Sequence, residues 1–158
     1  METDEGLEMD DASILICYDG SADSDRAIEA AAVLLGPRRA VVVDIGPTLT
    51  AAESVAAVSA VVPGNAFEDL NMDSALEKAR AGAGRAREAG FKAEPRAELM
   101  EPVWESIVDV ADEIDAAVIV LGSRGLKGIR EQFEGSVSHE VAEHAGRPVL
   151  IVPRANGR

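Results

Sequence analysis

The chain has 158 residues, enough for one domain with a sizeable core, and 47% of them are apolar although only 3% are aromatic. Its net charge of −14 argues against a nucleic-acid surface of clustered Lys and Arg, and no apolar run reaches the roughly 18 residues that a membrane helix needs. A single cysteine excludes an internal disulfide framework, and the acidic start does not resemble a signal peptide, so we expect a cytoplasmic protein.

The first residues differ sharply in composition from the rest. Residues 1–11 carry six acids and predict a disordered, solvated tail. The apolar segments that follow predict one domain over residues 12–153, with a flexible tail at residues 154–158.

The first apolar run, residues 14–18, does not alternate with polar residues, which is typical of a parallel strand covered on both faces. A helix is predicted next, with Ser21 as its N-cap and with Gly36-Pro37 as its end.

A second strand is predicted over residues 40–45. Residues 46–69 are harder to interpret, although residues 51–62 could form a short helix. An Ala-rich helix is expected over residues 72–89, ending at Gly90. Residues 91–99 alternate apolar and charged positions, and Pro95 among them predicts a strand at a sheet edge.

The C-terminal third continues the same alternation of elements. Pro102 suits the first position of a third long helix, and a buried strand is expected over residues 116–121. A glycine-containing loop, a helix over residues 136–145 and a strand over residues 149–152 complete the pattern. We therefore predict a three-layer α/β/α fold, Rossmann-like, with a five-stranded parallel sheet of order 3-2-1-4-5.

In this strand order the first and fourth strands are neighbours, and the order reverses between them. Ligands of open parallel sheets bind beyond the carboxyl ends of the strands at such a reversal. Two polar, glycine-bearing turns follow these strands, Asp19-Gly20-Ser21 and Gly122-Ser123-Arg124-Gly125. Glycines allow a backbone to approach a ligand closely, and free N–H groups at a helix start attract phosphate, so the pattern predicts a nucleotide site.

Local charge is consistent with phosphate, because Arg124, Lys127 and Arg130 occur without an intervening acid. These cations are equally compatible with an ordinary solvated loop.

At these residues the sequence resembles the universal stress protein family, over residues 12–153. The family's nucleotide signature, Gly-x2-Gly-x9-Gly-[Ser/Thr], is met by Gly122, Gly125, Gly135 and Ser136. The segment Asp19-Gly20-Ser21, with Ser24, is similar to a second motif of the family.

The resemblance implies an adenine-nucleotide α-hydrolase-like fold and membership in the ATP-binding branch of the family. By position, Cys17 and Asp19 would border adenine and ribose, and Ile45 would pack on the adenine. The backbone of the loop would contact ribose and phosphates, and the following helix start would hold the β and γ phosphates. The resemblance assigns these contacts to Gly122, Ser123, Arg124, Gly125, Gly135, Ser136, Val137 and Ser138.

The ligand implied is ATP, ADP or AMP, with Mg²⁺ or Mn²⁺ held through the nucleotide rather than by protein side chains. Two positions depart from the family pattern. Glu134 replaces an apolar residue, and Tyr18 is bulkier than the usual occupant, so we expect its ring to narrow the adenine pocket.

Other reactive side chains have structural interpretations. Cys17 lies within an apolar strand and is expected to be a buried thiol, and Trp104 is expected to pack in the core rather than line the crevice. His139 and His144 are five residues apart on one helix, a spacing that does not suit a shared metal site.

The last predicted strand, Val149 to Val152, is fully apolar although it lies at a sheet edge. An exposed apolar edge pairs readily with another chain, and we therefore expect a homodimer through this strand, as the resemblance also implies.

Three functions remain open at this stage. The leading hypothesis is a nucleotide-dependent regulator of stress response, with at most weak ATPase activity. The second is an ATP pyrophosphatase or adenylating enzyme, because Asp19-Gly-Ser-Ala-Asp-Ser24 is partly similar to the loop of that class. The third is a nucleotide-free dimeric scaffold for unknown protein partners.

Overall fold

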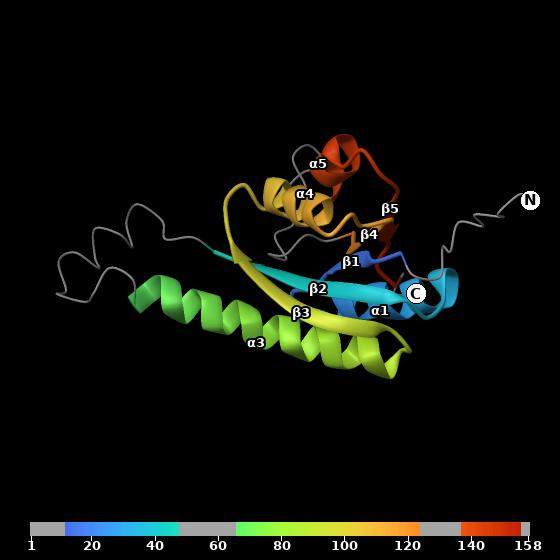
Figure 1. The fold of residues 1–158 in the computed structure, drawn as a ribbon, viewed down its shortest axis with the longest axis horizontal. Helices are drawn as coiled ribbons and strands as arrows, with labels where there is room; N and C mark the ends of the chain where they lie inside the picture. Colours follow the sequence, from blue (N-terminus) through green and yellow to red (C-terminus); the bar gives the residue numbers. More distant parts are fainter. Residues whose placement is uncertain (1–11, 48–65, 124–136, 156–158) are drawn as a thin grey trace, which may run out of the picture.

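A computed structural model of the chain describes residues 12–47, 66–123 and 137–155. These residues form a five-stranded parallel sheet of order β3-β2-β1-β4-β5 with helices on both faces (Figure 1), which confirms the predicted fold class and strand order. The strands are β1 Ile14–Cys17, β2 Arg39–Gly46, β3 Lys92–Leu99, β4 Ile119–Gly122 and β5 Val149–Val152. The helices are α1 Ala22–Leu35, α3 Ala66–Glu88, α4 Val103–Glu113 and α5 Val137–His144.

Local signals set both ends of α1 as predicted. The Ser21 side chain caps the helix by accepting a hydrogen bond from the Ser24 N–H at 3.1 Å. Gly36 ends the helix at a φ of +71°, a conformation that costs glycine little, and its N–H donates to the Ala32 carbonyl.

Three predicted boundaries were wrong, each for a structural reason. The helix α3 begins at Ala66 rather than at residue 72, and its first turns expose Leu70, so no buried apolar face marked them in the sequence. The strand β4 begins at Ile119 rather than at residue 116, because Ala116 instead bonds back to the end of α4. Pro102 is the N-cap of α4, one residue before its first helical position.

Other expectations fall outside the described residues. They are the short helix at residues 51–62, the acidic tail at residues 1–11, the end of the C-terminal tail, and the predicted start of the last helix at Ser136.

Side chains that alternate along the strands divide the core into two clusters. On one face, Ile14, Ile16 and Val42 pack against small residues of α1 and α3, such as Ala27 and Ala83. On the other face the cluster contains aliphatic residues of α4 and the thiol of the strand β1; its main members are Leu15, Cys17, Val43, Ile45, Ile107, Ile119 and Leu121. The two edge strands differ from these buried central strands.

The strand β3 is an edge strand that contains Pro95, as predicted, and alternates at its start between buried Ala93 and exposed Lys92 and Glu94. The other edge, β5, exposes 38% of Ile151. Within the part of the chain that the structure describes, no helix combines the length and hydrophobicity needed to cross a bilayer.

Candidate functional site

The turn after β1 and the end of β4 lie against each other at the carboxyl edge of the sheet. β1 and β4 are parallel neighbours, with Ile16 paired to Val120. A Cβ added at Gly122 would lie 3.3 Å from the carbonyl oxygen of Asp23, in the first turn of α1. Two segments about 100 residues apart in the sequence therefore meet where the strand order reverses.

Gly122 itself is the last residue of β4 rather than part of a loop. It pairs with Val152 of β5, and the next residue, Ser123, donates its N–H to the Val152 carbonyl at 2.9 Å. The immediate reason for glycine here is thus the close approach of the α1 backbone, which leaves little room for a side chain.

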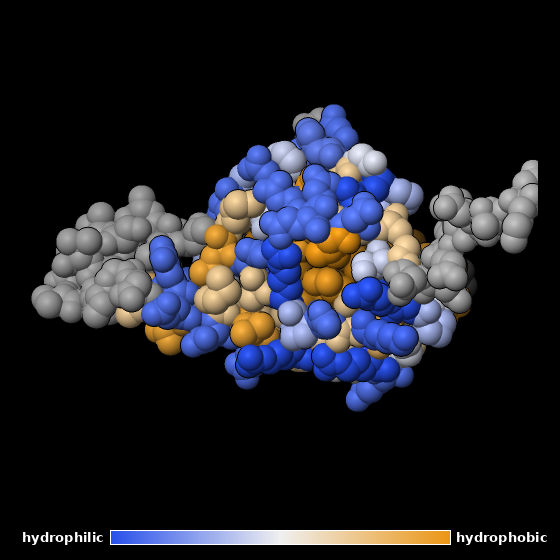
Figure 2. All heavy atoms as spheres, viewed as in Figure 1, coloured by the Kyte–Doolittle hydropathy of each residue, from blue (hydrophilic) through white to orange (hydrophobic). Residues whose placement is uncertain are grey.

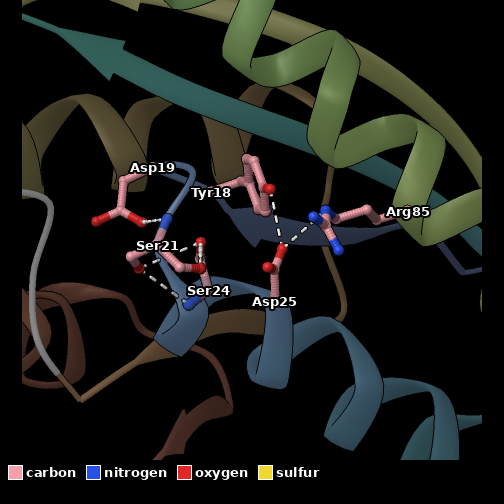
Figure 3. Close-up of polar contacts among 6 residues, drawn as sticks. All are labelled: Tyr18, Asp19, Ser21, Ser24, Asp25 and Arg85. Carbon is pink, nitrogen blue, oxygen red and sulfur yellow. Dashed lines mark hydrogen bonds and ion pairs between the residues drawn. The ribbon is translucent and has the colours of Figure 1, made fainter.

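The turn Asp19-Gly20-Ser21 is fixed by its own hydrogen bonds (Figure 3). The Asp19 carboxylate accepts from the Ser21 N–H at 2.9 Å, and Gly20 has a φ of +83° that disfavours other residues. The Ser24 hydroxyl donates to the Ser21 carbonyl at 2.8 Å. One Asp19 oxygen points away from the turn in Figure 3, so the half-buried carboxylate can still accept a bond from a ligand.

Three predicted site residues share the aliphatic cluster beneath this edge. Cys17 and Ile45 are both 6% exposed, and Val137 of α5 packs on the same cluster. Burial, with the negative charges of Asp19 and Asp44 as lesser causes, raises the pKa of Cys17 to about 12. The thiol is therefore protonated and buried, as the sequence indicated, and not a reactive nucleophile.

The phosphate-binding residues are only partly described. Ser138 is buried in the first turn of α5. Arg124, Gly125, Gly135 and Ser136 lie outside the described residues, and their roles stay predictions.

The expectation that Tyr18 narrows an adenine pocket was wrong. Its ring packs on the opposite face of the sheet from Cys17, against Gly82 of α3. A Cβ added at Gly82 would lie 2.6 Å from the ring. Its hydroxyl donates to Asp25 at 2.9 Å, and Arg85 pairs with the same carboxylate oxygen at 3.1 Å (Figure 3). Successive side chains of a strand point to opposite faces, which places Tyr18 away from Cys17.

Sequence reasoning missed Asp44, a buried carboxylate close to the carboxyl end of β2. It is 2% exposed, and among the described residues its Oδ2 has no hydrogen-bond partner, although Lys78 Nζ lies 3.9 Å away. Burial raises the pKa of Asp44 to about 6, the Lys78 charge lowers it, and the Asp19 charge raises it further. The sequence did carry a signal for this residue, because Asp44 is the single acid inside the apolar run of residues 40–45.

The two histidines lie on α5 and each faces a carboxylate of its own helix. His139 is 3.7 Å from Glu143, and His144 is 3.6 Å from Glu140. His144 also stacks on Trp104 at 4.6 Å between ring centroids, and Trp104 packs on the aliphatic cluster as expected. Glu140, Glu143 and His144 lie close enough to share an ion, but all three are at the surface, where acidic groups commonly gather without one.

At this edge the described residues bring together an apolar cluster, the half-buried carboxylate of Asp19 and the hydroxyl of Ser138 at a helix start. The chain also matches the sequence model of the universal stress protein family over residues 12–153.

The chain belongs to the universal stress protein family. It is 32% identical over 147 residues to universal stress protein YxiE of Bacillus subtilis. The aligned region covers 88% of this chain and 97% of the relative.

Solved structures show the same fold. The structure of MJ0577 of Methanocaldococcus jannaschii superposes with a TM-score of 0.73 at 22% identity, covering 92% of this chain and 98% of that one. A universal stress protein solved in complex with cAMP superposes with a TM-score of 0.58 at 27% identity, covering 90% and 96% of the two chains.

Proposed function

We propose that this universal stress protein binds ATP at the carboxyl edge of the sheet and acts as a nucleotide-dependent regulator. The observation that carries the proposal is the contact of Gly122 with the first turn of α1, since it joins the two motif-bearing segments at one edge. The solved relative in complex with cAMP supports binding of an adenine nucleotide by this fold.

In this proposal the described residues bind the base and ribose, and the signature residues bind the phosphates. Asp19 accepts a hydrogen bond from the nucleoside, while Cys17 and Ile45 provide apolar contact beside it. Ser138 and the start of α5 contact the terminal phosphates, with a divalent cation held by the nucleotide. Such a cation neutralises phosphate charge in a strongly acidic protein.

The proposal assigns no catalytic residue, and we expect ATP turnover at most at the rate of a weak ATPase. The test begins with the purified protein, which is denatured so that released nucleotide can be quantified by anion-exchange chromatography. Near-stoichiometric ATP or ADP is the expected result. Titration calorimetry with Mg-ATP then measures affinity in protein stripped of nucleotide.

The matched variants are Asp19→Asn and Asp73→Asn. Asp19→Asn preserves an acceptor for the Ser21 N–H but removes the charge, so we expect roughly 10- to 100-fold weaker binding. Asp73 is exposed on α3, and its replacement should leave affinity unchanged.

Two results would contradict the regulator hypothesis. Absence of both co-purified nucleotide and a thermal shift with Mg-ATP would favour the scaffold function. Release of pyrophosphate with ATP and an acceptor would favour an adenylating enzyme.

We further propose a homodimer joined along β5. The free edge of β5 carries the exposed Ile151, and an apolar surface beside it includes Val33 and Leu34 of α1, which are 85% and 65% exposed. Exposed apolar side chains at a sheet edge are normally covered by a second chain. We expect Ile151→Lys to convert a dimer to a monomer in light scattering, whereas a native protein that is already monomeric would overturn the proposal.

A further inference from the structure

The amino ends of the strands, opposite the candidate site, hold a pocket that the proposed function does not use. It lies at the amino ends of β1, β2 and β3 and has a volume of about 620 Å³. We call it the amino-end pocket; its lining includes Ser13, Arg39, Val41, Arg87, Lys92 and Glu94. Figure 2 shows the face of the molecule seen in Figure 1, where apolar residues are exposed between the polar surfaces of α4 and β3.

The charge of this pocket opposes that of the whole protein. Three of its lining residues, Arg39, Arg87 and Lys92, are cations, against the single acid Glu94, in a chain of net charge −14. All three cations are exposed. Arg39 and Lys92 are register partners on β2 and β3, so their side chains stand next to each other.

These cations also differ in pairing from most others. Arg26, Lys78, Arg85, Arg96 and Arg147 each form an ion pair with an Asp or Glu. Within residues 12–47, 66–123 and 137–155, no carboxylate pairs with Arg39, Arg87 or Lys92, and Arg87 donates only to the Ala93 carbonyl. The pocket thus presents positive charge that its described neighbours do not neutralise.

The chain leaves the described fold at the wall of this pocket. The Ser13 carbonyl accepts the Ala117 N–H at 2.8 Å, which fixes the point from which residues 1–11 depart. Those residues contain six acids together with the apolar Leu7 and Met9. At roughly 3.3 Å per residue, Glu8 can extend about 13 Å from Ala12, and the adjacent Ser13 lines the same pocket as the cations.

We propose that the acidic segment of residues 1–11 docks on the amino-end pocket of its own chain. Its carboxylates pair with Arg39, Arg87 and Lys92, and an apolar side chain of the segment covers Val41. The short connection gives the segment a high effective concentration, so weak ion pairs suffice to hold it.

Spin labelling of the full-length protein tests this docking. The variant Gly6→Cys retains all six acids, and the nitroxide reagent attaches there selectively because Cys17 is buried. In ¹⁵N-labelled protein at low salt, we expect the amide signals of Val41, Lys92 and Glu94 to fall to about half or less, because the label is then held nearby. Signals of β5 should be unaffected.

The matched control is the same labelled protein with Arg39→Gln, Arg87→Gln and Lys92→Gln. In this control, the amide signals near the amino-end pocket should recover their intensity. They should also recover in the labelled protein with its native cations in about 0.5 M NaCl, because salt strongly screens the charges. Reversing charges on both sides, with the six acids changed to Lys and with Arg39→Glu and Lys92→Glu, should restore the broadening.

Three outcomes would overturn the proposal. They are no local broadening in the native protein, equal broadening after the three cations are neutralised, and broadening only when labelled and ¹⁵N-labelled chains are mixed, which would indicate docking on a second copy. Native mass spectrometry that detects a bound small anion, in protein whose tail causes no broadening, would assign the pocket to that anion instead.

Discussion

The two faces of the sheet use different physical means to hold their helices. On the α4/α5 side, β1, β2 and β4 meet aliphatic side chains such as Ile107. On the α1/α3 side the helices approach through Ala and Gly, and the buried layer includes Tyr18 and Asp44. One face therefore gains stability from hydrophobic volume, while the other depends on close backbone approach and on polar groups that must be satisfied.

The largest expected effect is on the aliphatic face. Ile107 is fully buried, so Ile107→Ala should lower the free energy of unfolding by about 2–5 kcal/mol through lost burial and a cavity. Urea denaturation followed by circular dichroism measures the loss. Leu70→Ala, at a position 65% exposed, is the control and should change stability by no more than about 0.5 kcal/mol.

The close approach on the other face is tested at Gly82. An added Cβ would lie 2.6 Å from the Tyr18 ring and 2.9 Å from a Val42 methyl, so Gly82→Ala should destabilise the fold by roughly 1–3 kcal/mol. Gly84 lies on the same helix, and no atom of the described residues comes within 4 Å of its Cβ position, so Gly84→Ala should stabilise the fold by up to about 1 kcal/mol. Equal effects at both glycines would show that helix propensity, rather than packing on Tyr18, decides the result.

The buried carboxylate predicts a pH dependence. Because folding raises the pKa of Asp44 from 3.8 to about 6, the folded state binds its proton more tightly than the unfolded chain does. The contribution of Asp44 to stability is then fully present below about pH 4 and is lost as pH rises through about 6.

Relative to Asp44→Asn, the native protein should therefore lose roughly 2.5 kcal/mol of stability between pH 4 and pH 7. Denaturant midpoints of both proteins across this range measure the difference. The control Asp73→Asn, at an exposed position of α3, should follow the native profile. A constant difference between Asp44→Asn and the native protein would show that Asp44 is solvated when the protein is folded.

The smallest effect is expected at the Tyr18 hydroxyl. Tyr18→Phe removes its hydrogen bond to Asp25 and should cost about 0.5–1.5 kcal/mol. Burial, followed by this hydrogen bond and the Asp25 charge, raises the pKa of Tyr18 above 10. Since Tyr18 is the single tyrosine, its ultraviolet absorbance titration should show this pKa directly.

In Asp25→Asn the titration of Tyr18 should move back toward 10 without reaching it, because burial remains. A midpoint of about 10 in both proteins would mean that the ring is exposed in solution.

Much of the fold could be predicted because its signals are local. The unbroken apolar runs identified β1 and β5, and Ser21, Gly36 and Gly90 marked helix ends through capping and turn chemistry. Exposed elements were harder, since the first turns of α3 carry no buried stripe. The start of β4 was also hard to place, because Ala116 bonds to Ala111 of α4 while Ala117 and Val118 already bond to Ser13 and Leu15 beside them.

The sequence by itself determined the family, the order of elements, and the two segments that carry the nucleotide motifs, because these depend on residue type and spacing. Only the tertiary structure decided that Gly122 abuts α1, that Tyr18 turns away from Cys17, and that the buried Asp44 Oδ2 finds no hydrogen-bond partner in the described part of the chain. It also decided that Arg39 and Lys92 stand together. Each of these depends on which face of a strand a side chain occupies and on what a distant segment places opposite it.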